Sequence, residues 1–284
     1  MRSHKDLIPI VYHSRCADYS VAGHPESPER IVRTREHLDH LGYQFHTPQV
    51  GEIDDLLSVH PRKHLERLKD GDFFDPDTPP IPDILEIAMI SAGGAILASE
   101  LSGFSLCRPP GHHATRNQPQ GFCYLNNIAV AVMRKVKDGK KVAILDIDCH
   151  HGNGTEEIFI HNSSVIYISL HQSPLYPGTG LLSHDNLFNY PLEPMTDGLA
   201  YRKVLNKGLD EIARWGSDLV AVSAGFDTYH GDPLTALNLE VDDYYEIGRM
   251  IRGLGLPTFS VLEGGYSSDL PRLVENYLRG LCGG

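Results

Sequence analysis

The chain has 284 residues, of which 41% are hydrophobic and 22% are charged, so it is long enough to bury a large core. Its formal net charge of −12 argues against nucleic acid as a general partner, because phosphate binding needs a positive surface, whereas cationic substrates would be tolerated. No repeat or low-complexity tract divides the sequence, and we therefore expect a single domain over residues 1–284.

Cysteine usage and the first residues indicate the compartment. The cysteines are odd in number, scattered, and form no Cys-x-x-Cys pair, which indicates free thiols in a reducing compartment. They are Cys16, Cys107, Cys123, Cys149 and Cys282. Residues 1–6 lack the apolar core of a signal peptide, and we expect no stretch of about 18 apolar residues that could span a membrane. The sequence therefore predicts a cytoplasmic protein without membrane contact, and it does not indicate an oligomeric state.

Strands and helices are expected to alternate. In chain order, we expect a strand at 8–12, helices at 28–41 and 84–101, a strand at 104–107, a helix at 126–136, a strand at 142–145, a helix entered at 155–160, a strand at 165–169, a helix at 200–214, strands at 218–223 and 257–262, and a terminal helix. The Gly93-Gly94 pair would let the helix at 84–101 pack closely. Because parallel strands need crossover connections, this order predicts an α/β fold with a mostly parallel sheet and helices on both faces.

A dense group of polar residues follows the strand at 142–145. Asp146, Asp148 and His150 are spaced by two, so an extended chain would point all three side chains to one side. Carboxylate oxygens with an imidazole nitrogen suit a catalytic zinc or ferrous ion that keeps one position open for water. The alternative is that the aspartates and glycines only form a turn and the histidines cap a helix.

Other reactive residues also follow predicted strands. His112 and His113 come after the strand at 104–107, Asp227 follows the strand at 218–223, and Tyr266 follows the last strand. The carboxyl ends of parallel strands line one crevice, so these side chains are expected to converge on a single site. Taken singly, the two histidines could be a hydrogen-bonded turn, Asp227 a loop carboxylate, and Tyr266 a packed aromatic.

Six motifs in order resemble the zinc-dependent histone deacetylase superfamily, including its bacterial and archaeal amidohydrolases. They are Arg-Pro-Pro-Gly-His-His at 108–113, Gly-Phe-Cys-Tyr-Leu-Asn-Asn at 121–127, Asp-Ile-Asp-Cys-His-His-Gly-Asn-Gly at 146–154, Pro-Gly-Thr-Gly at 177–180, Ser-Ala-Gly-Phe-Asp at 223–227 and Glu-Gly-Gly-Tyr at 263–266. The resemblance spans nearly the whole chain. It implies the three-layer α/β fold of arginase and the deacetylases, and hydrolysis of an acyl-lysine amide.

The resemblance also implies a metal centre with acid–base residues beside it. Zinc, with ferrous iron as the alternative, would be held by Asp148, His150 and Asp227, leaving room for water and the scissile carbonyl. His113 would be the general base that later protonates the leaving amine, and His112 would be its electrostatic partner.

Three further residues would support this chemistry by the same resemblance. Tyr266 would donate its hydroxyl to the carbonyl oxygen and stabilise the oxyanion. Asp146 would orient His112, and Asn153 would orient His113, where class I members have aspartate and class II members have asparagine. The sequence thus predicts a His–Asn pair whose imidazolium is less stabilised than in a His–Asp pair. The loop glycines Gly264-Gly265 are expected to give Tyr266 freedom to move when substrate arrives.

The family places a monovalent cation, usually potassium and otherwise sodium, close to the zinc loop. Its ligands would be the side chains of Asp146 and Ser169 and the backbone carbonyls of Asp148, His150 and Leu170. The alternative is that Ser169 is an ordinary hydroxyl at the end of a strand.

The same resemblance predicts the substrate tunnel. Gly121, Phe122 and Tyr176 would form narrow walls around an aliphatic amine stem, and Leu234 would stand at the rim. Polyamine-specific relatives have an acidic residue at the rim, so Leu234 favours acyl-lysine in a protein or peptide, although an aspartate in the loop at 73–78 could partly substitute.

We therefore interpret the chain as a zinc-dependent deacetylase of acyl-lysine. The alternative is the same chemistry on a small acylamine such as an acetylated polyamine. A third hypothesis is a non-catalytic acyl-lysine reader, and the complete set of metal ligands, histidines and tyrosine argues against it, because a binding module needs no general base.

Overall fold

A computed structural model describes residues 7–283 and contains one eight-stranded sheet. Its strands are β1 (Ile10–Val11), β2 (Phe45–His46), β3 (Phe104–Ser105), β4 (Val142–Asp146), β5 (Val165–Gln172), β6 (Leu187–Leu192), β7 (Leu219–Ala224) and β8 (Thr258–Leu262). Their spatial order is β2-β1-β3-β8-β7-β4-β5-β6, and every neighbouring pair is parallel. The predicted parallel sheet is confirmed, and all of its carboxyl ends meet at one edge.

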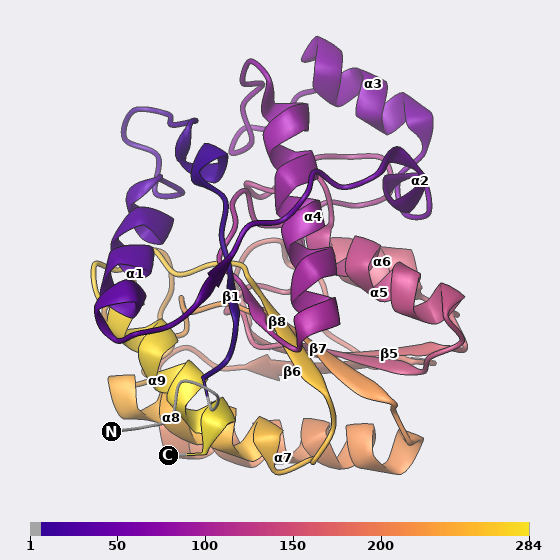
Figure 1. The fold of residues 1–284 in the computed structure, drawn as a ribbon. Coiled ribbons are helices and arrows are strands. Elements are labelled where there is room, and N and C mark those ends of the chain that lie inside the picture. Colours follow the sequence, from indigo (N-terminus) through magenta and orange to yellow (C-terminus); the bar gives the residue numbers. More distant parts are fainter. Residues whose placement is uncertain (1–6, 284) are drawn as a thin grey trace.

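Helices cover both faces of the sheet. They are α1 (Glu29–His40), α2 (Ile53–Leu56), α3 (Arg62–Asp70), α4 (Ile84–Leu101), α5 (Asn127–Lys137), α6 (Asn153–Phe159), α7 (Gly198–Trp215), α8 (Val241–Arg252) and α9 (Leu270–Cys282), with a short 3-10 helix, η2 (Ser14–Ala17). In Figure 1, α7, α8 and α9 lie below the sheet, whereas α4, α5 and α6 lie above it. The chain therefore has the predicted three layers.

The central strands are buried on both sides. In β4, the side chains of Ala143 and Leu145 join the core under α1, α7, α8 and α9, whereas those of Val142 and Ile144 join the core under α2 to α6. All four residues are fully buried. This double burial explains why these strands are uninterrupted apolar runs rather than alternating ones.

Several elements were not predicted. The sequence prediction lacked the edge strands β2 and β6 and the helices α2, α3 and α8. β2 has only two residues, and β6 contains Pro191, which is tolerated because β6 lies at the edge of the sheet. α8 did carry a signal in its sequence, because Glu240 and Asp243 form a capping box at its start.

Helix α4 corrects one sequence expectation. Over 18 residues its mean hydropathy is 1.6, so by length and composition it is apolar enough to cross a membrane. However, 67% of this stretch is buried inside the molecule, where the helix packs on the sheet. A Cβ on Gly93 would lie 2.0 Å from the carbonyl oxygen of Gln49, so the predicted close packing at the glycine pair is confirmed. Its hydropathy therefore reflects a core helix.

The cysteines form no disulfide with one another, as their number and scatter predicted.

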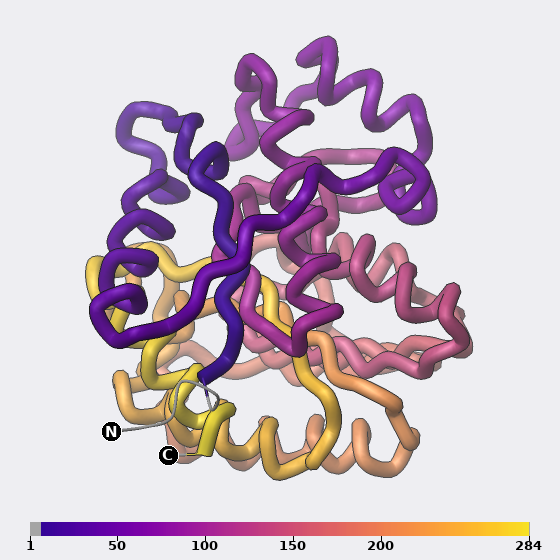
Figure 2. Tube along the Cα trace, in the orientation of Figure 1, coloured from indigo at the N-terminus to yellow at the C-terminus, as the bar shows by residue number. Residues whose placement is uncertain are grey.

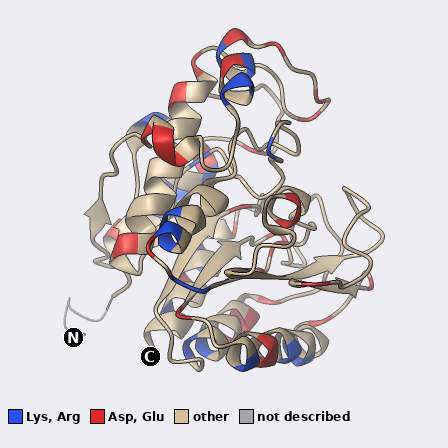
Figure 3. Cartoon of the chain, turned by 90° about the vertical axis from the view of Figure 1, so that its right-hand side faces the viewer, with Lys and Arg blue, Asp and Glu red and all other residues tan. Residues whose placement is uncertain are grey.

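The two ends of the described chain lie close to each other. The tube in Figure 2 shows the start of the described chain and the end of α9 on the same side of the molecule, where Ile8 and Leu281 line one cavity. In the cartoon of Figure 3, residues coloured blue (Lys, Arg) and red (Asp, Glu) both occur along the helices at the bottom of the view.

Candidate active site

Three ligand-type side chains converge at the carboxyl edge of the sheet. The ligand atoms of Asp148, His150 and Asp227 lie within 4.8 Å of one another. Asp148 and His150 follow β4, and Asp227 follows the neighbouring strand β7. The convergence predicted from strand ends is therefore observed for these residues. Asp146, which its spacing of two residues also predicted to join this group, lies outside it, because β4 ends at Asp146 and the chain beyond it is no longer extended.

Backbone N–H groups orient both carboxylates. In Asp148, Oδ1 accepts from the amide of His150 at 2.8 Å, and Oδ2 accepts from the amide of Gly264 at 2.7 Å. In Asp227, Oδ1 accepts from the amide of Cys149 at 2.8 Å, whereas Oδ2 is buried without a hydrogen-bond partner among the described residues. This Oδ2 lies 2.8 Å from Nδ1 of His150. An orphaned carboxylate oxygen beside an imidazole nitrogen fits a metal ligand set.

The electrostatics also favour a bound cation. Burial and the neighbouring Asp148 raise the pKa of Asp227 to about 7. Against its burial, Asp148 and Asp227 raise the pKa of His150 to about 10. Two buried carboxylates this close are costly unless a positive charge lies between them. With two oxygen ligands and one nitrogen, the site suits zinc or ferrous iron.

Two histidines stand beside this cluster in different electrostatic states. Nδ1 of His112 lies 3.1 Å from Oδ2 of Asp146, and, against burial, Asp146 and Asp148 raise the pKa of His112 to about 10. Nδ1 of His113 lies 2.8 Å from Oδ1 of Asn153, and burial together with His112 holds the pKa of His113 well below its usual value. Because the amide oxygen can only accept, Nδ1 of His113 carries the proton and Nε2 is free to accept one.

The tyrosine loop closes the site from β8. The ring of Tyr266 lies edge-on to that of Phe122, with centroids 5.7 Å apart, and under the guanidinium of Arg30 at 4.7 Å. A Cβ on Gly264 would lie 2.5 Å from Oδ2 of Asp227, and Gly265 has a φ of +118°. Close approach and a positive φ therefore account for both glycines. The freedom of movement expected from them is not needed to explain their presence.

A cavity of about 250 Å³ leads to these groups. The predicted tunnel residues Gly121, Phe122, Tyr176 and Leu234 all line it, together with His112, His113, His150 and Tyr266. Phe122 has a φ of +70°, which its amide maintains by donating to the hydroxyl of Thr78 at 2.8 Å. The ring of Tyr176 lies edge-on to that of His113, with centroids 5.1 Å apart. Aromatic side chains therefore form part of the cavity wall, and its use as a substrate tunnel remains a prediction.

The expected monovalent-cation ligands are also neighbours. Asp146 of β4 pairs in register with Ser169 of β5, and Leu170 follows in the same strand. The hydroxyl of Ser169 lies 2.9 Å from Nδ1 of His171. The ion itself remains a prediction.

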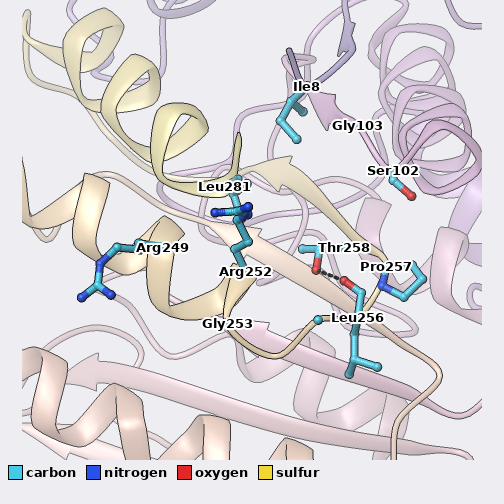
Figure 4. Close-up of a pocket in the computed structure, with 11 residues that line it drawn as sticks. Ile8, Ser102, Gly103, Arg249, Arg252, Gly253, Leu256, Pro257, Thr258 and Leu281 are labelled. Carbon is cyan, nitrogen blue, oxygen red and sulfur yellow. Dashed lines mark hydrogen bonds between the residues drawn. The ribbon is translucent and has the colours of Figure 1, made fainter. Parts of the chain in front are cut away.

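A second, larger cavity of about 560 Å³ lies at the opposite edge of the sheet, where β3 and β8 begin (Figure 4). Its described lining contains Arg249 and Arg252, but no histidine, cysteine or carboxylate. Arg249 already pairs with Glu246. Because this cavity lacks an acid, a base and a ligand set, the smaller cavity is the candidate active site.

Several residues that shape the site were not predicted from the sequence. Asp77 lines the mouth of the cavity, although the prediction named only its loop. Glu263 accepts from the amides of Gly111 and His112 at 2.7 and 3.1 Å, and Asp232 accepts from the amide of Tyr266 at 2.7 Å. Glu263 stands in a recognised motif, but nothing local to Asp77 or Asp232 indicates these contacts.

Comparisons with known proteins agree with this geometry. The sequence profile of the histone deacetylase domain matches residues 24–281. The chain is 37% identical to a probable deacetylase of Methanothermobacter thermautotrophicus, covering 96% of this chain and 91% of that protein. It is 38% identical to a histone deacetylase-like amidohydrolase of Pseudomonas aeruginosa (87% and 74% covered) and 37% identical to an acetylpolyamine amidohydrolase of Mycoplana ramosa (71% and 64%).

Solved structures show the same fold. The HD domain of HDA15 superposes with a TM-score of 0.89 at 30% identity, covering 97% of this chain and 91% of that one. An acetylpolyamine aminohydrolase from Burkholderia pseudomallei has a TM-score of 0.89 at 26% identity, covering 96% and 98%.

Proposed function

The chain belongs to the histone deacetylase family of amide hydrolases, and we propose that its substrate is a small acylamine carrying a second cationic group, as acetylated polyamines do. The observation that carries this proposal is Asp77, an exposed carboxylate on the lining of the cavity mouth. Relatives named acetylpolyamine amidohydrolase support it. Their names favour a polyamine substrate over the acyl-lysine substrate that Leu234 at the rim favours.

Negatively charged side chains lie near the mouth. Burial raises the pKa of Tyr176, and the carboxylates of Asp75 and Asp77 raise it further. A distal ammonium group that protrudes from the tunnel would meet these carboxylates, while the methylene stem lies between Phe122 and Tyr176. A peptide substrate would place neutral backbone at the same position, so the charge favours the polyamine.

We assign the chemistry to the residues around the cluster. Bound between Asp148, His150 and Asp227, a divalent metal would polarise the amide carbonyl and lower the pKa of water. Nε2 of His113, unprotonated because Asn153 holds the proton on Nδ1, would take the proton of the attacking water and later deliver it to the leaving amine.

The remaining residues would set charge and shape. Tyr266 would donate its hydroxyl to the developing oxyanion from the side facing Phe122. His112, kept protonated by Asp146, would keep positive charge beside His113 and so keep His113 a weak base that releases its proton readily. These roles serve only a chemical reaction, so they argue against a non-catalytic acyl-lysine reader.

The test is a kinetic comparison of an acetylated polyamine with an acetyl-lysine peptide. We expect kcat/KM to favour the polyamine in the wild type, and Asp77→Asn to lower it about fivefold for the polyamine only, since an exposed ion pair is worth roughly 1 kcal/mol. Asp138→Asn removes the same charge at the exposed end of α5 and serves as the control. A preference for the peptide that survives Asp77→Asn unchanged would favour the acyl-lysine hypothesis instead.

Three further predictions remain part of the proposal. They are a single domain over residues 1–284, a cytoplasmic location, and potassium or sodium at Asp146 and Ser169. Zinc and ferrous iron would be distinguished by metal analysis of the purified protein.

A further inference from the structure

The loop that carries Tyr266 is tied down at three successive residues. The amide of Gly264 donates to Asp148 at 2.7 Å, the carbonyl of Gly265 accepts from Nε of Arg30 at 2.7 Å, and the amide of Tyr266 donates to Oδ2 of Asp232 at 2.7 Å. The first anchor comes from the candidate metal site and the second from α1. The third comes from the segment between β7 and α8, which also forms the rim of the cavity.

Asp232 also binds the rim itself. Its Oδ1 accepts from the amide of Leu234 at 3.0 Å, while its Oδ2 holds Tyr266. The contact with Leu234 is a local turn of a common kind, since the two residues are two apart. The contact with Tyr266 spans 34 residues of sequence and joins two loops on different strands. One carboxylate therefore connects the rim to the residue proposed to stabilise the oxyanion.

Asp232 is suited to this connection because it is buried and satisfied on both oxygens. Only 6% of the residue is exposed, so a rearranged carboxylate would lose hydrogen bonds without regaining them from water. Burial raises the pKa of Asp232, and the amides of Tyr266 and Leu234 counteract that rise. Only a carboxylate can accept on both atoms, because the nitrogen of an amide side chain would face an N–H group.

We propose that Asp232 is a positioning residue that couples the rim at Leu234 to the placement of Tyr266, so that the tyrosine hydroxyl is held where the oxyanion forms. This inference rests on the proposed role of Tyr266 in the hydrolysis. It implies that a substrate in contact with Leu234 at the rim also affects the carboxylate of Asp232, which positions the loop of Tyr266. The substrate's fit at the mouth and the rate of hydrolysis are then linked through one side chain.

A double-mutant cycle tests the proposal. Asp232→Asn in the wild type should lower kcat roughly 10- to 100-fold with little change in KM, because a small displacement of a positioned group is expensive only in the transition state. The same substitution in a Tyr266→Phe background should lower kcat less than about threefold, because the hydroxyl it positions is already absent. Asp269→Asn is the matched control, since that carboxylate accepts from the hydroxyl of Tyr229 in the same region, whereas the amide of Tyr266 donates to Asp232.

The outcomes separate the possible failures. Equal losses in both backgrounds would mean that Asp232 has only a structural role, and the coupling would be refuted while the proposed function stands. A Tyr266→Phe enzyme with the wild-type rate would refute both. Amide hydrogen exchange gives a readout that does not depend on activity: exchange in Asp232→Asn should become faster around Tyr266 and Leu234 and stay unchanged in α4 and α5. Unchanged exchange around Tyr266 would also overturn the coupling.

Discussion

Replacing Tyr266 with phenylalanine isolates the hydroxyl from everything else the side chain does. The ring packs against Phe122 and under Arg30, and the amide is held by Asp232, so all of these contacts survive the substitution. These contacts involve the ring and the backbone and not the hydroxyl, so removal of the hydroxyl should leave folding and metal binding intact. We expect the melting temperature and the metal content of Tyr266→Phe to match the wild type.

The rate should nevertheless fall steeply. Loss of one oxyanion donor typically lowers kcat by about 10²–10³, which is roughly 3–4 kcal/mol, whereas a hydrogen bond lost from ground-state binding costs about 1 kcal/mol. The loss should appear in kcat more than in KM, because the interaction strengthens as charge develops on the carbonyl oxygen. Steady-state kinetics on the better of the two acetylated substrates would measure this. Turnover within about threefold of the wild type, less than about 1 kcal/mol, would contradict the assignment.

Other changes probe the metal and the base. Asp148→Ala or Asp227→Ala should abolish activity and lower the bound metal, since each removes one of the three proposed protein ligands; full activity with full metal content would contradict the ligand set. The low pKa of His113 keeps this base unprotonated at acidic pH, so the acidic limb of kcat/KM should lie below about 6.5, the usual imidazole value. Asn153→Asp places a negative charge 2.8 Å from Nδ1 and should raise that pKa, which moves the limb to higher pH; an unmoved profile would exclude His113 as the titrating base.

The sequence predicted the site well where each residue is positioned by its own strand. Asp227 could be placed because it lies just beyond β7, and parallel order brings the ends of β4, β7 and β8 together. The spacing of two residues failed for Asp146, whose carboxylate lies beside His112 instead of joining the candidate metal ligands. Side-chain direction at the end of a strand depends on where the extended conformation stops, and spacing alone does not reveal that.

Contacts between loops were beyond prediction for a different reason. Asp77 reaches the cavity because its loop is held against Phe122, whose amide donates to Thr78, and against His24, which lies 3.1 Å from the carbonyl of Asp77. None of these partners is near the others in sequence. Their arrangement follows from tertiary packing of loops, which leaves no periodic pattern in the chain.

The segment His24–Arg30 illustrates how far such packing extends. The sequence predicted only the helix that begins at residue 28, yet Glu26 is 3% exposed and binds the buried guanidinium of Arg108 and, at 3.1 Å, that of Arg30. Arg30 in turn donates to the carbonyls of Glu263 and Gly265. A buried charge without its partner is costly, so the carboxylate of Glu26 keeps the guanidinium of Arg30 in place. Through Arg30, Glu26 holds α1 against the loop that carries Tyr266. The position of the proposed oxyanion donor thus depends on ion pairs of Glu26, a residue that lies outside every recognised motif of the site.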